Sequence, residues 1–284
     1  MKLSTKLLIG LAIFLFVVPT LVASYFVRIN RVDANVYHAN VEKEVSNPDA
    51  ADVYFRSFPV GKFDKLQILG SDARGINLHV VKSDKFMVKV NKSQADLVKT
   101  KIEADGVLVL DFLEGSDKYY KYYKSVYIFT PDLKILKLKK ADINEFSAKL
   151  DEFTIVGDSV ENFTLSGETA INTLNLVLTN SHIDDFGYRD DKNTAPVSHL
   201  RVDITNTNLG LPRVDYKTAD ILAKNSEVYF NRKGDKSRVD VLDIKTEGVS
   251  SVRLDSLQWN TLKGRLSNDT KIDLPVHALR NLIK

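Results

Sequence analysis

A short cassette recurs from about Leu150 to Leu257, and this repeat restricts the possible folds more than any single residue does. In each copy apolar residues alternate with others, and a further apolar residue follows the turn. The copies begin at Phe153, Phe163, Leu176, Val202, Ile221 and Ile244, and their turn residues are Gly157, Gly167, Asn180, Asn206, Asn225 and Gly248. Alternation turns every second side chain of a strand to one face, and Gly or Asn tolerates a positive φ. Such a unit cannot bury its apolar face alone, so the repeat predicts a stacked β-solenoid.

An uncharged apolar stretch from Leu7 to Val27 precedes the repeats. At about 1.5 Å per residue, a helix of this length spans the hydrocarbon core of a bilayer, about 30 Å. Pro19 is tolerated in a membrane helix, and lysines precede the stretch. We therefore expect a single-pass helix in a bacterial inner membrane, with the rest of the chain extracytoplasmic, in the periplasm. The alternative is a signal peptide cleaved near Val22-Ala23-Ser24.

Composition excludes several classes of protein. The 284 residues carry 40 basic and 37 acidic side chains, so the net charge of +3 predicts no nucleic-acid partner. The chain has no cysteine, which excludes disulfides, thiolate chemistry and a lipoprotein anchor. With 44% apolar residues, the chain can bury a sizeable core.

The segment between the apolar stretch and the repeats reads as a connector followed by strands. A short helix over Val36–Val45 and a turn at Asn47-Pro48-Asp49 are expected in the connector. Alternation over Ile76–Val80 and Phe86–Val90, with a polar turn between, predicts a β-hairpin. The resulting divisions are 1–6 cytoplasmic N-terminus, 7–27 transmembrane helix or signal anchor, 28–61 connector, 62–274 β-solenoid and 275–284 C-terminal tail.

The strand motifs resemble those of a known family. Phe63-Asp-Lys-Leu66-Gln-Ile68-Leu-Gly70, Ile76-Asn-Leu78-His-Val80, Asp105-Gly106 and Val126-Tyr-Ile128-Phe-Thr-Pro131 are similar to the opening of the auto-transporter adhesin, head GIN domain family. Phe163-Thr-Leu165-Ser-Gly167 is its cleanest repeat. The resemblance covers roughly Phe63 to Trp259. It implies an all-β fold, a right-handed parallel β-helix outside the cytoplasm, of a kind common in Bacteroidetes-like bacteria. Lys139-Lys140-Ala141-Asp142 departs from the family pattern, because a turn of small residues is expected there.

The asparagines at the turns allow two interpretations. Asn180, Asn206 and Asn225 can hydrogen-bond along the stack as a structural ladder. The alternative is a row of amides that bind a ligand. The ladder is the favoured interpretation.

Candidate catalytic or metal-binding residues are few. The five histidines show no metal-ligand spacing, and no cofactor motif occurs. Asp184, Asp185, Asp190 and Asp191 form the best acidic cluster, next to His182. Carboxylates of this kind bind calcium or serve polysaccharide hydrolases, but a solvated loop between two coils is the favoured interpretation. We therefore expect no metal, no cofactor and no catalytic residue.

A tyrosine-rich segment is the candidate contact surface: Tyr119, Tyr120, Lys121, Tyr122, Tyr123 and Lys124. Tyrosine presents an apolar face and a hydroxyl to sugars or proteins, and lysine attracts anionic groups. A plain strand edge is the favoured interpretation of this segment, since Tyr and Lys both suit edges, but if the sequence shows a recognition site, it is this one. The sequence as a whole predicts a membrane-tethered binding or adhesion module without enzymatic activity, whose partner is an envelope protein or a glycan. Two alternatives are an envelope-assembly protein that pairs with another β protein and, less favoured, a carbohydrate-active β-helix enzyme.

Overall fold

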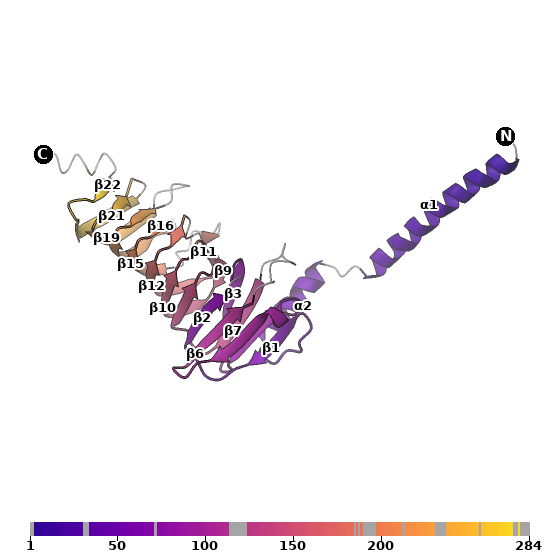
Figure 1. Cartoon of the computed structure of the whole chain (residues 1–284), viewed down its shortest axis with the longest axis horizontal. Coiled ribbons are helices and arrows are strands. Elements are labelled where there is room, and N and C mark those ends of the chain that lie inside the picture. Colours follow the sequence, from indigo (N-terminus) through magenta and orange to yellow (C-terminus); the bar gives the residue numbers. More distant parts are fainter. Residues whose placement is uncertain are drawn as a thin grey trace. The chain divides into compact units, whose positions relative to one another are not determined.

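The computed structural model describes residues 3–30, 34–70, 73–113, 124–184, 186, 188–189, 197–211, 214–230, 237–255, 257–274 and 278. The chain divides into two compact units, Met1–Glu44 and Val45–Lys284, and each is described by itself. The long helix belongs to the first unit and all the strands to the second (Figure 1).

The first unit begins with one long apolar helix, α1 (Leu3–Asn30). It contains the expected 7–27 stretch, including Pro19, and its apolar side chains are exposed. By length and composition α1 can cross a membrane, and a signal sequence shares these properties. A second helix, α2 (Ala34–Ser46), confirms the short helix expected in the connector, with slightly wider bounds.

The strands of the second unit form three sheets. The ten-stranded sheet has the order β21 (Leu257–Arg265), β19 (Ser237–Glu247), β17 (Tyr216–Lys224), β15 (Val197–Thr205), β12 (Ala170–Thr179), β10 (Lys149–Asp158), β8 (Ile135–Lys139), β2 (Lys65–Gly70), β6 (Val107–Phe112) and β5 (Val98–Ile102). The seven-stranded sheet has the order β1 (Phe55–Pro59), β4 (Met87–Asn91), β7 (Lys124–Thr130), β3 (Ile76–Lys82), β9 (Ile143–Ser147), β11 (Phe163–Ser166) and β14 (Tyr188–Arg189). The five-stranded sheet has the order β13 (His182–Ile183), β16 (Asn208–Leu211), β18 (Glu227–Phe230), β20 (Ser251–Arg253) and β22 (Lys271–Asp273).

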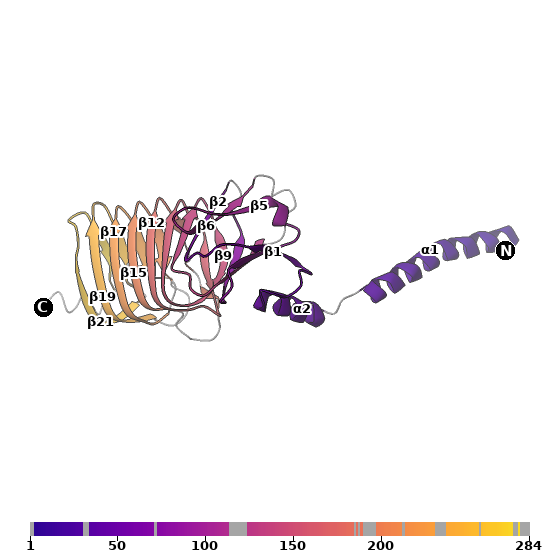
Figure 2. The ribbon, with the colours of Figure 1, turned by 90° about the horizontal axis from the view of Figure 1, so that it is seen from below.

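From β8 onward the chain winds as a solenoid. Each coil contributes one long strand to the ten-stranded sheet, and neighbouring coils pair in parallel (Figure 2). The register places Leu176 beside Val202, Val202 beside Ile221, and Ile221 beside Ile244. These side chains are buried, so the structure confirms the all-β solenoid and the inward face that the alternation predicted.

Two of the predicted cassettes, those that begin at Phe153 and Phe163, are not equivalent to the others in the structure. The Phe163 cassette lies in β11, on a different wall of the coil that begins with β10. In β10, Ile155 rather than Phe153 pairs with Leu176, so the turn residue of this coil is Ser159, with a φ of 58°. Gly157 is instead an inward strand residue, and a Cβ added there would lie 2.7 Å from Leu178 Cδ2. Its small size is needed for packing rather than for turning.

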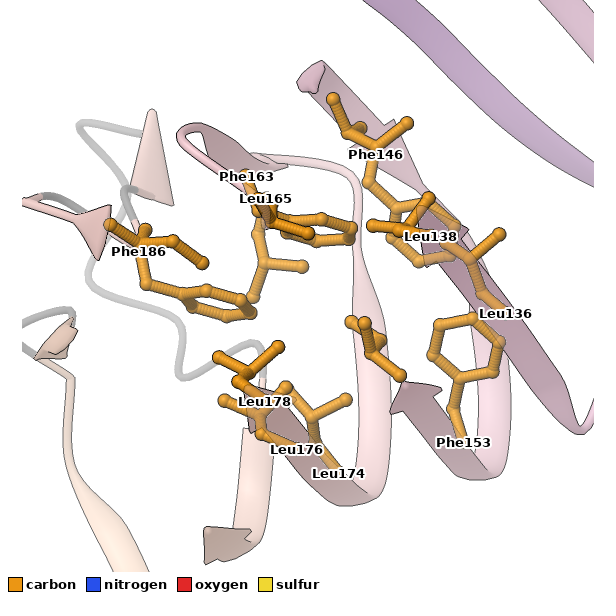
Figure 3. Packing of buried hydrophobic residues seen from close by; sticks show 14 of the residues in the cluster. Leu136, Leu138, Phe146, Phe153, Phe163, Leu165, Leu174, Leu176, Leu178 and Phe186 are labelled. Carbon is orange, nitrogen blue, oxygen red and sulfur yellow. The ribbon is translucent and has the colours of Figure 1, made fainter. Parts of the chain in front are cut away.

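Phenylalanines from successive coils stack inside the solenoid (Figure 3). The rings of Phe146 and Phe153 lie 5.1 Å apart and nearly parallel, and those of Phe163 and Phe186 repeat this arrangement at 5.1 Å. Phe146 also contacts Phe163, with ring centroids 5.6 Å apart. Aromatic pairs of this kind add to the stabilisation that burial alone provides. The core is therefore continuous from coil to coil.

The expected hairpin between β3 and β4 is wrong. β7 lies between them, parallel to β3 and antiparallel to β4. The polar turn after Lys82 does join the two segments, but β7, which comes about forty residues later, pairs with both. The other predicted turns, at Asn47–Asp49 and Asp105-Gly106, are confirmed.

Candidate functional site

A column of left-handed residues marks one corner of the solenoid, where each coil leaves the ten-stranded sheet. Its members, with positive φ of 47° to 62°, are Lys140, Ser159, Asn180, Asn206, Asn225 and Gly248. Asn and Gly tolerate this conformation best, which explains the turn residues of the later coils. Lys140 occupies the same corner, so the departure from the family pattern at this turn leaves the turn itself intact.

A ladder of buried hydroxyls lies directly behind this column. Its members are Ser181, Thr207, Ser226 and Ser250, each following a corner residue by one or two positions. The backbone N–H of Ser181 donates to Thr207 Oγ1 at 3.2 Å, and that of Thr207 donates to Ser226 Oγ at 3.0 Å. Each of these hydroxyls in turn donates to a carbonyl of its own coil; for example, Ser226 Oγ lies 2.7 Å from Lys224 O. The ladder satisfies buried backbone groups where the sheet hydrogen bonds end.

The hydroxyl ladder was not predicted from the sequence, although the sequence contains a signal for it. A Ser or Thr immediately follows each corner asparagine, in Asn180-Ser181, Asn206-Thr207 and Asn225-Ser226. In the two preceding coils Ala141 and Val160 stand at this position, so the ladder belongs to the C-terminal coils.

An open groove of about 700 Å³ runs along this corner, across successive coils. Its lining includes Asn180, Asn206, Asn225, His182, Asn208, Glu227, Ser251 and Lys271. Parallel pairing aligns His182 with Asn208, Asn208 with Glu227, and then Ser251 with Lys271. The groove is therefore bounded by two columns of mostly uncharged polar side chains, one on the corner and one on the five-stranded sheet.

The corner asparagines form only a partial ladder. Asn206 Nδ2 donates to Asn180 Oδ1 at 3.4 Å, and Asn180 Nδ2 donates to Asp158 Oδ1 at 3.3 Å. Asn225 Oδ1 accepts a hydrogen bond from the backbone N–H of Val249 at 3.2 Å. Among the described residues, no hydrogen bond joins the Asn225 amide to the Asn206 amide. The structural interpretation holds for Asn180 and Asn206, and polar groups remain available at Asn206 and Asn225.

A tyrosine lies beside the groove, on β18. The Tyr229 hydroxyl donates to Asp184 O at 2.8 Å and lies 3.2 Å from Asp184 Oδ1. Partial burial, together with the negative charge of Asp184, raises the pKa of Tyr229 to about 12. The Arg253 guanidinium lies over the ring, 4.4 Å from its centroid, and a guanidinium nitrogen lies 2.8 Å from Glu227 Oε1. These contacts hold Tyr229 as a neutral hydrogen-bond donor and give the Glu227 carboxylate a counter-ion.

The predicted contact segment falls mostly outside the described residues. Tyr119, Tyr120, Lys121, Tyr122 and Tyr123 lie in that part, and the proposal that they bind a partner stays a prediction. Lys124, at the start of β7, is only 3% exposed, and its Nζ lies 5.8 Å from the ring centroid of Phe112. It is an inward residue and does not contribute to an exposed contact surface, because strand alternation turns it toward the core.

The predicted acidic cluster is likewise only partly described. Asp185, Asp190 and Asp191 lie outside the described residues. Asp184 is exposed, and its Oδ1 lies 3.2 Å from His182 Nε2 and 3.2 Å from the Tyr229 hydroxyl. Within the described part of the chain, no group of three acidic or histidine side chains is placed to hold a metal ion.

Comparison with known proteins finds likenesses only among solved structures. No protein-family model matches the sequence, and no curated protein matches it. A "putative adhesin" from Parabacteroides merdae is 13% identical with a TM-score of 0.45, over 77% of this chain and 94% of that one. A "putative adhesin" from Bacteroides fragilis is 12% identical with a TM-score of 0.37, over 78% and 96%. A "putative lipid binding protein" from Parabacteroides distasonis is 12% identical with a TM-score of 0.36, over 77% and 92%.

Proposed function

We propose that the protein is a membrane-tethered, extracytoplasmic binding module without catalytic activity, whose ligand is a component of the cell envelope. The observation that carries this proposal is the polar groove along the C-terminal coils. Parallel strands and the hydroxyl ladder hold the backbone around it, so the groove is already formed before any ligand arrives. A preformed site loses less conformational entropy on binding.

The proposed tether is α1. Its apolar stretch is long enough to cross a bilayer, and Lys6 precedes it, in keeping with a cytoplasmic N-terminus. The solenoid then lies in the periplasm of a bacterial inner membrane, where it meets envelope polymers and proteins. Retention of α1 in the mature chain is part of the proposal, with a cleaved signal as its alternative.

A capture experiment tests binding. The full-length chain in lipid nanodiscs is mixed with solubilised envelope from the source cells, and retained material is identified by mass spectrometry and sugar analysis. We expect one component to be retained in stoichiometric amount and recovered intact, with empty nanodiscs as the control. Retention no greater than on empty nanodiscs would contradict a binding role, and recovery of a shortened polymer would indicate a hydrolase or lyase instead.

One observation favours the second candidate, an envelope-assembly protein. β21 is the last strand of the ten-stranded sheet, and among the described residues no strand pairs with its outer edge. Such an edge can accept a strand from another β protein. If the captured component is a β-rich protein that crosslinks to Lys263 in β21, the assembly role replaces the binding role.

A further inference from the structure

The groove repeats the same polar groups at a fixed interval. Asn180, Asn206 and Asn225 come from successive coils, and the aligned column on β16 and β18 adds Asn208 and Glu227. Neighbouring strands lie about 4.8 Å apart, so a ligand along the solenoid axis meets a new set of polar groups at this spacing. A regular array of this kind suits a polymer rather than a single small molecule.

Part of the hydrogen-bonding capacity in this array is unused. The Asn206 amide nitrogen donates to Asn180, and this leaves Asn206 Oδ1 as an acceptor. Asn225 spends its Oδ1 on the Val249 N–H, which leaves its Nδ2 as a donor. Asn208 Oδ1, in the groove wall, is buried without a hydrogen-bond partner among the described residues. Because Asn208 Oδ1 is buried, the groups that a ligand can reach are the Asn206 acceptor and the Asn225 donor, and the hydroxyls of a sugar can pair with both.

The charges of the groove do not select an ionic polymer. Glu227 is paired with Arg253, and His182 lies against Asp184. Of the described residues that line the groove, Lys271 alone is a lysine or arginine. With acids and bases balanced, uncharged amides and hydroxyls dominate recognition.

The spacing distinguishes a glycan from a peptide. An extended peptide advances about 3.3 Å per residue, so its side chains on one face repeat at about 6.6 Å and fall out of step with the coils. Every pyranose unit of a glycan carries hydroxyls around its ring, so each coil meets donors and acceptors whichever face a unit turns toward the groove.

We propose that the groove between Asn180 and Lys271 binds a neutral, extended glycan that lies along the solenoid axis, with Asn206 and Asn225 as its main hydrogen-bonding residues. This inference rests on the proposed binding function and names the class of ligand. The neighbouring Tyr229 hydroxyl is protonated at physiological pH, as an ordinary tyrosine is, and its hydrogen bond keeps Asp184 oriented beside the groove.

Titration of the full-length chain in detergent micelles with cellohexaose, chitohexaose and maltohexaose tests the proposal by calorimetry. We expect at least one hexaose to bind, and its disaccharide to bind more than tenfold more weakly because it spans fewer coils. The double variant Asn206→Gly/Asn225→Gly removes both amides but keeps residues that accept a positive φ. Loss of about one hydrogen bond at each position predicts at least a tenfold weaker affinity.

The matched control is Lys140→Gly/Ser159→Gly, which makes the same backbone change at the same corner but outside the groove. It should bind the hexaose with unchanged affinity. Binding that survives in the Asn206/Asn225 variant, equal loss in both double variants, or preference for an anionic oligosaccharide such as hexaguluronate would overturn the proposal. Absence of binding to all three neutral hexaoses would overturn it too, while capture of another envelope component would leave the broader binding function standing.

Discussion

The two ends of the solenoid are built differently. At the N-terminal end, β5 pairs antiparallel with β6, and β4 pairs antiparallel with β7, so added strands cover the first coils. The inward side chains there, such as Leu110 and Ile128, are fully buried. At the C-terminal end Leu262 of β21 aligns with the buried Leu242 of β19, yet Leu262 is 41% exposed. Among the described residues, the stack is therefore closed by reversed strands at one end and has a partly exposed core at the other.

This difference shows what a stack of coils cannot supply by itself. Each coil is stabilised mainly by its two neighbours, so a coil with one neighbour is the least stable. The antiparallel strands give the N-terminal coils a second neighbour, while β21 and β22 each pair with one strand in the part of the chain that the structure describes. Local opening is expected to begin at the C-terminal coil, which carries Lys271 at one end of the groove.

The largest expected effect is a charge placed in a middle coil. Phe163 and Leu176 are almost fully buried, so Phe163→Asp or Leu176→Asp should unfold the solenoid. An unpaired buried carboxylate costs several kcal/mol, against a total stability of about 5–15 kcal/mol. Val177→Asp, next in the chain but outward and 38% exposed, is the control and should melt cooperatively like the unchanged protein. A soluble, cooperatively melting Leu176→Asp protein would show that the strand register is wrong.

The two leucines at the C-terminal end test the comparison directly. Leu242→Ala should lower the free energy of unfolding by about 2–5 kcal/mol, because it leaves a cavity in a closed core. Leu262→Ala, at the aligned position of the next coil, should cost roughly 1 kcal/mol, since much of that side chain already meets water. Chemical denaturation monitored by circular dichroism measures both values. Equal losses would mean that another part of the chain covers the C-terminal coil as fully as β5 covers β6.

The hydroxyl ladder predicts a smaller effect, confined to the C-terminal coils. Ser226→Ala removes the acceptor for the Thr207 N–H and should cost about 1–3 kcal/mol. For a unit of this size that corresponds to a fall in Tm of about 2–4 °C per kcal/mol. Ser226→Thr keeps the hydroxyl and should melt near the unchanged protein, as Thr207 occupies the same position one coil earlier. If the alanine and threonine variants melt alike, the ladder does not contribute to stability.

The smallest expected effect is a pH dependence near the closed end. His79 on β3 lies 2.7 Å from Ser147 Oγ and stacks on Tyr127, and burial lowers its pKa, partly offset by Glu145 and Glu168. Because the folded-state pKa lies below the unfolded value of about 6.5, the unfolded chain binds the proton more readily. The contribution of neutral His79 to the free energy of unfolding is therefore complete above the unfolded-state pKa, and it decreases as the pH falls toward the folded-state pKa. Melting temperatures between pH 7.5 and 5 should therefore decline less in His79→Gln; an identical decline would assign the effect to other groups.

Local sequence patterns predicted well which residues of each coil point inward, but they predicted poorly the order in which the strands pair. Alternation correctly placed Leu176, Val202 and Ile221 inward, because the period of two is a property of each strand alone. The position of β7 between β3 and β4 could not be predicted in this way, because the pairing of strands far apart in the sequence produces no periodic pattern within any one of them. A turn after Lys82 suits both a hairpin and a crossover, and only the rest of the sheet decides between them.

The site was predictable only in part, for a related reason. The corner asparagines could be predicted because asparagine tolerates a positive φ. Ser159 and Lys140 adopt the same conformation, although neither residue type favours it. Ser181, Thr207 and Ser226 each follow a corner asparagine in the sequence, but the ladder that they form exists only once the coils stack. The groove follows from the alignment of coils and therefore required the structure.

The proposed function depends most on a solenoid that is tethered to the membrane and held outside the cytoplasm. Because the chain has no cysteine, single substitutions allow clean labelling with a membrane-impermeant maleimide. Lys245→Cys, on the exposed face of β19, should be labelled in intact spheroplasts. Mass spectrometry of the labelled protein should show that the chain still carries its N-terminal residues. Ser4→Cys should be labelled only after the membrane is permeabilised. Labelling of Ser4→Cys but not of Lys245→Cys in intact spheroplasts would contradict the account.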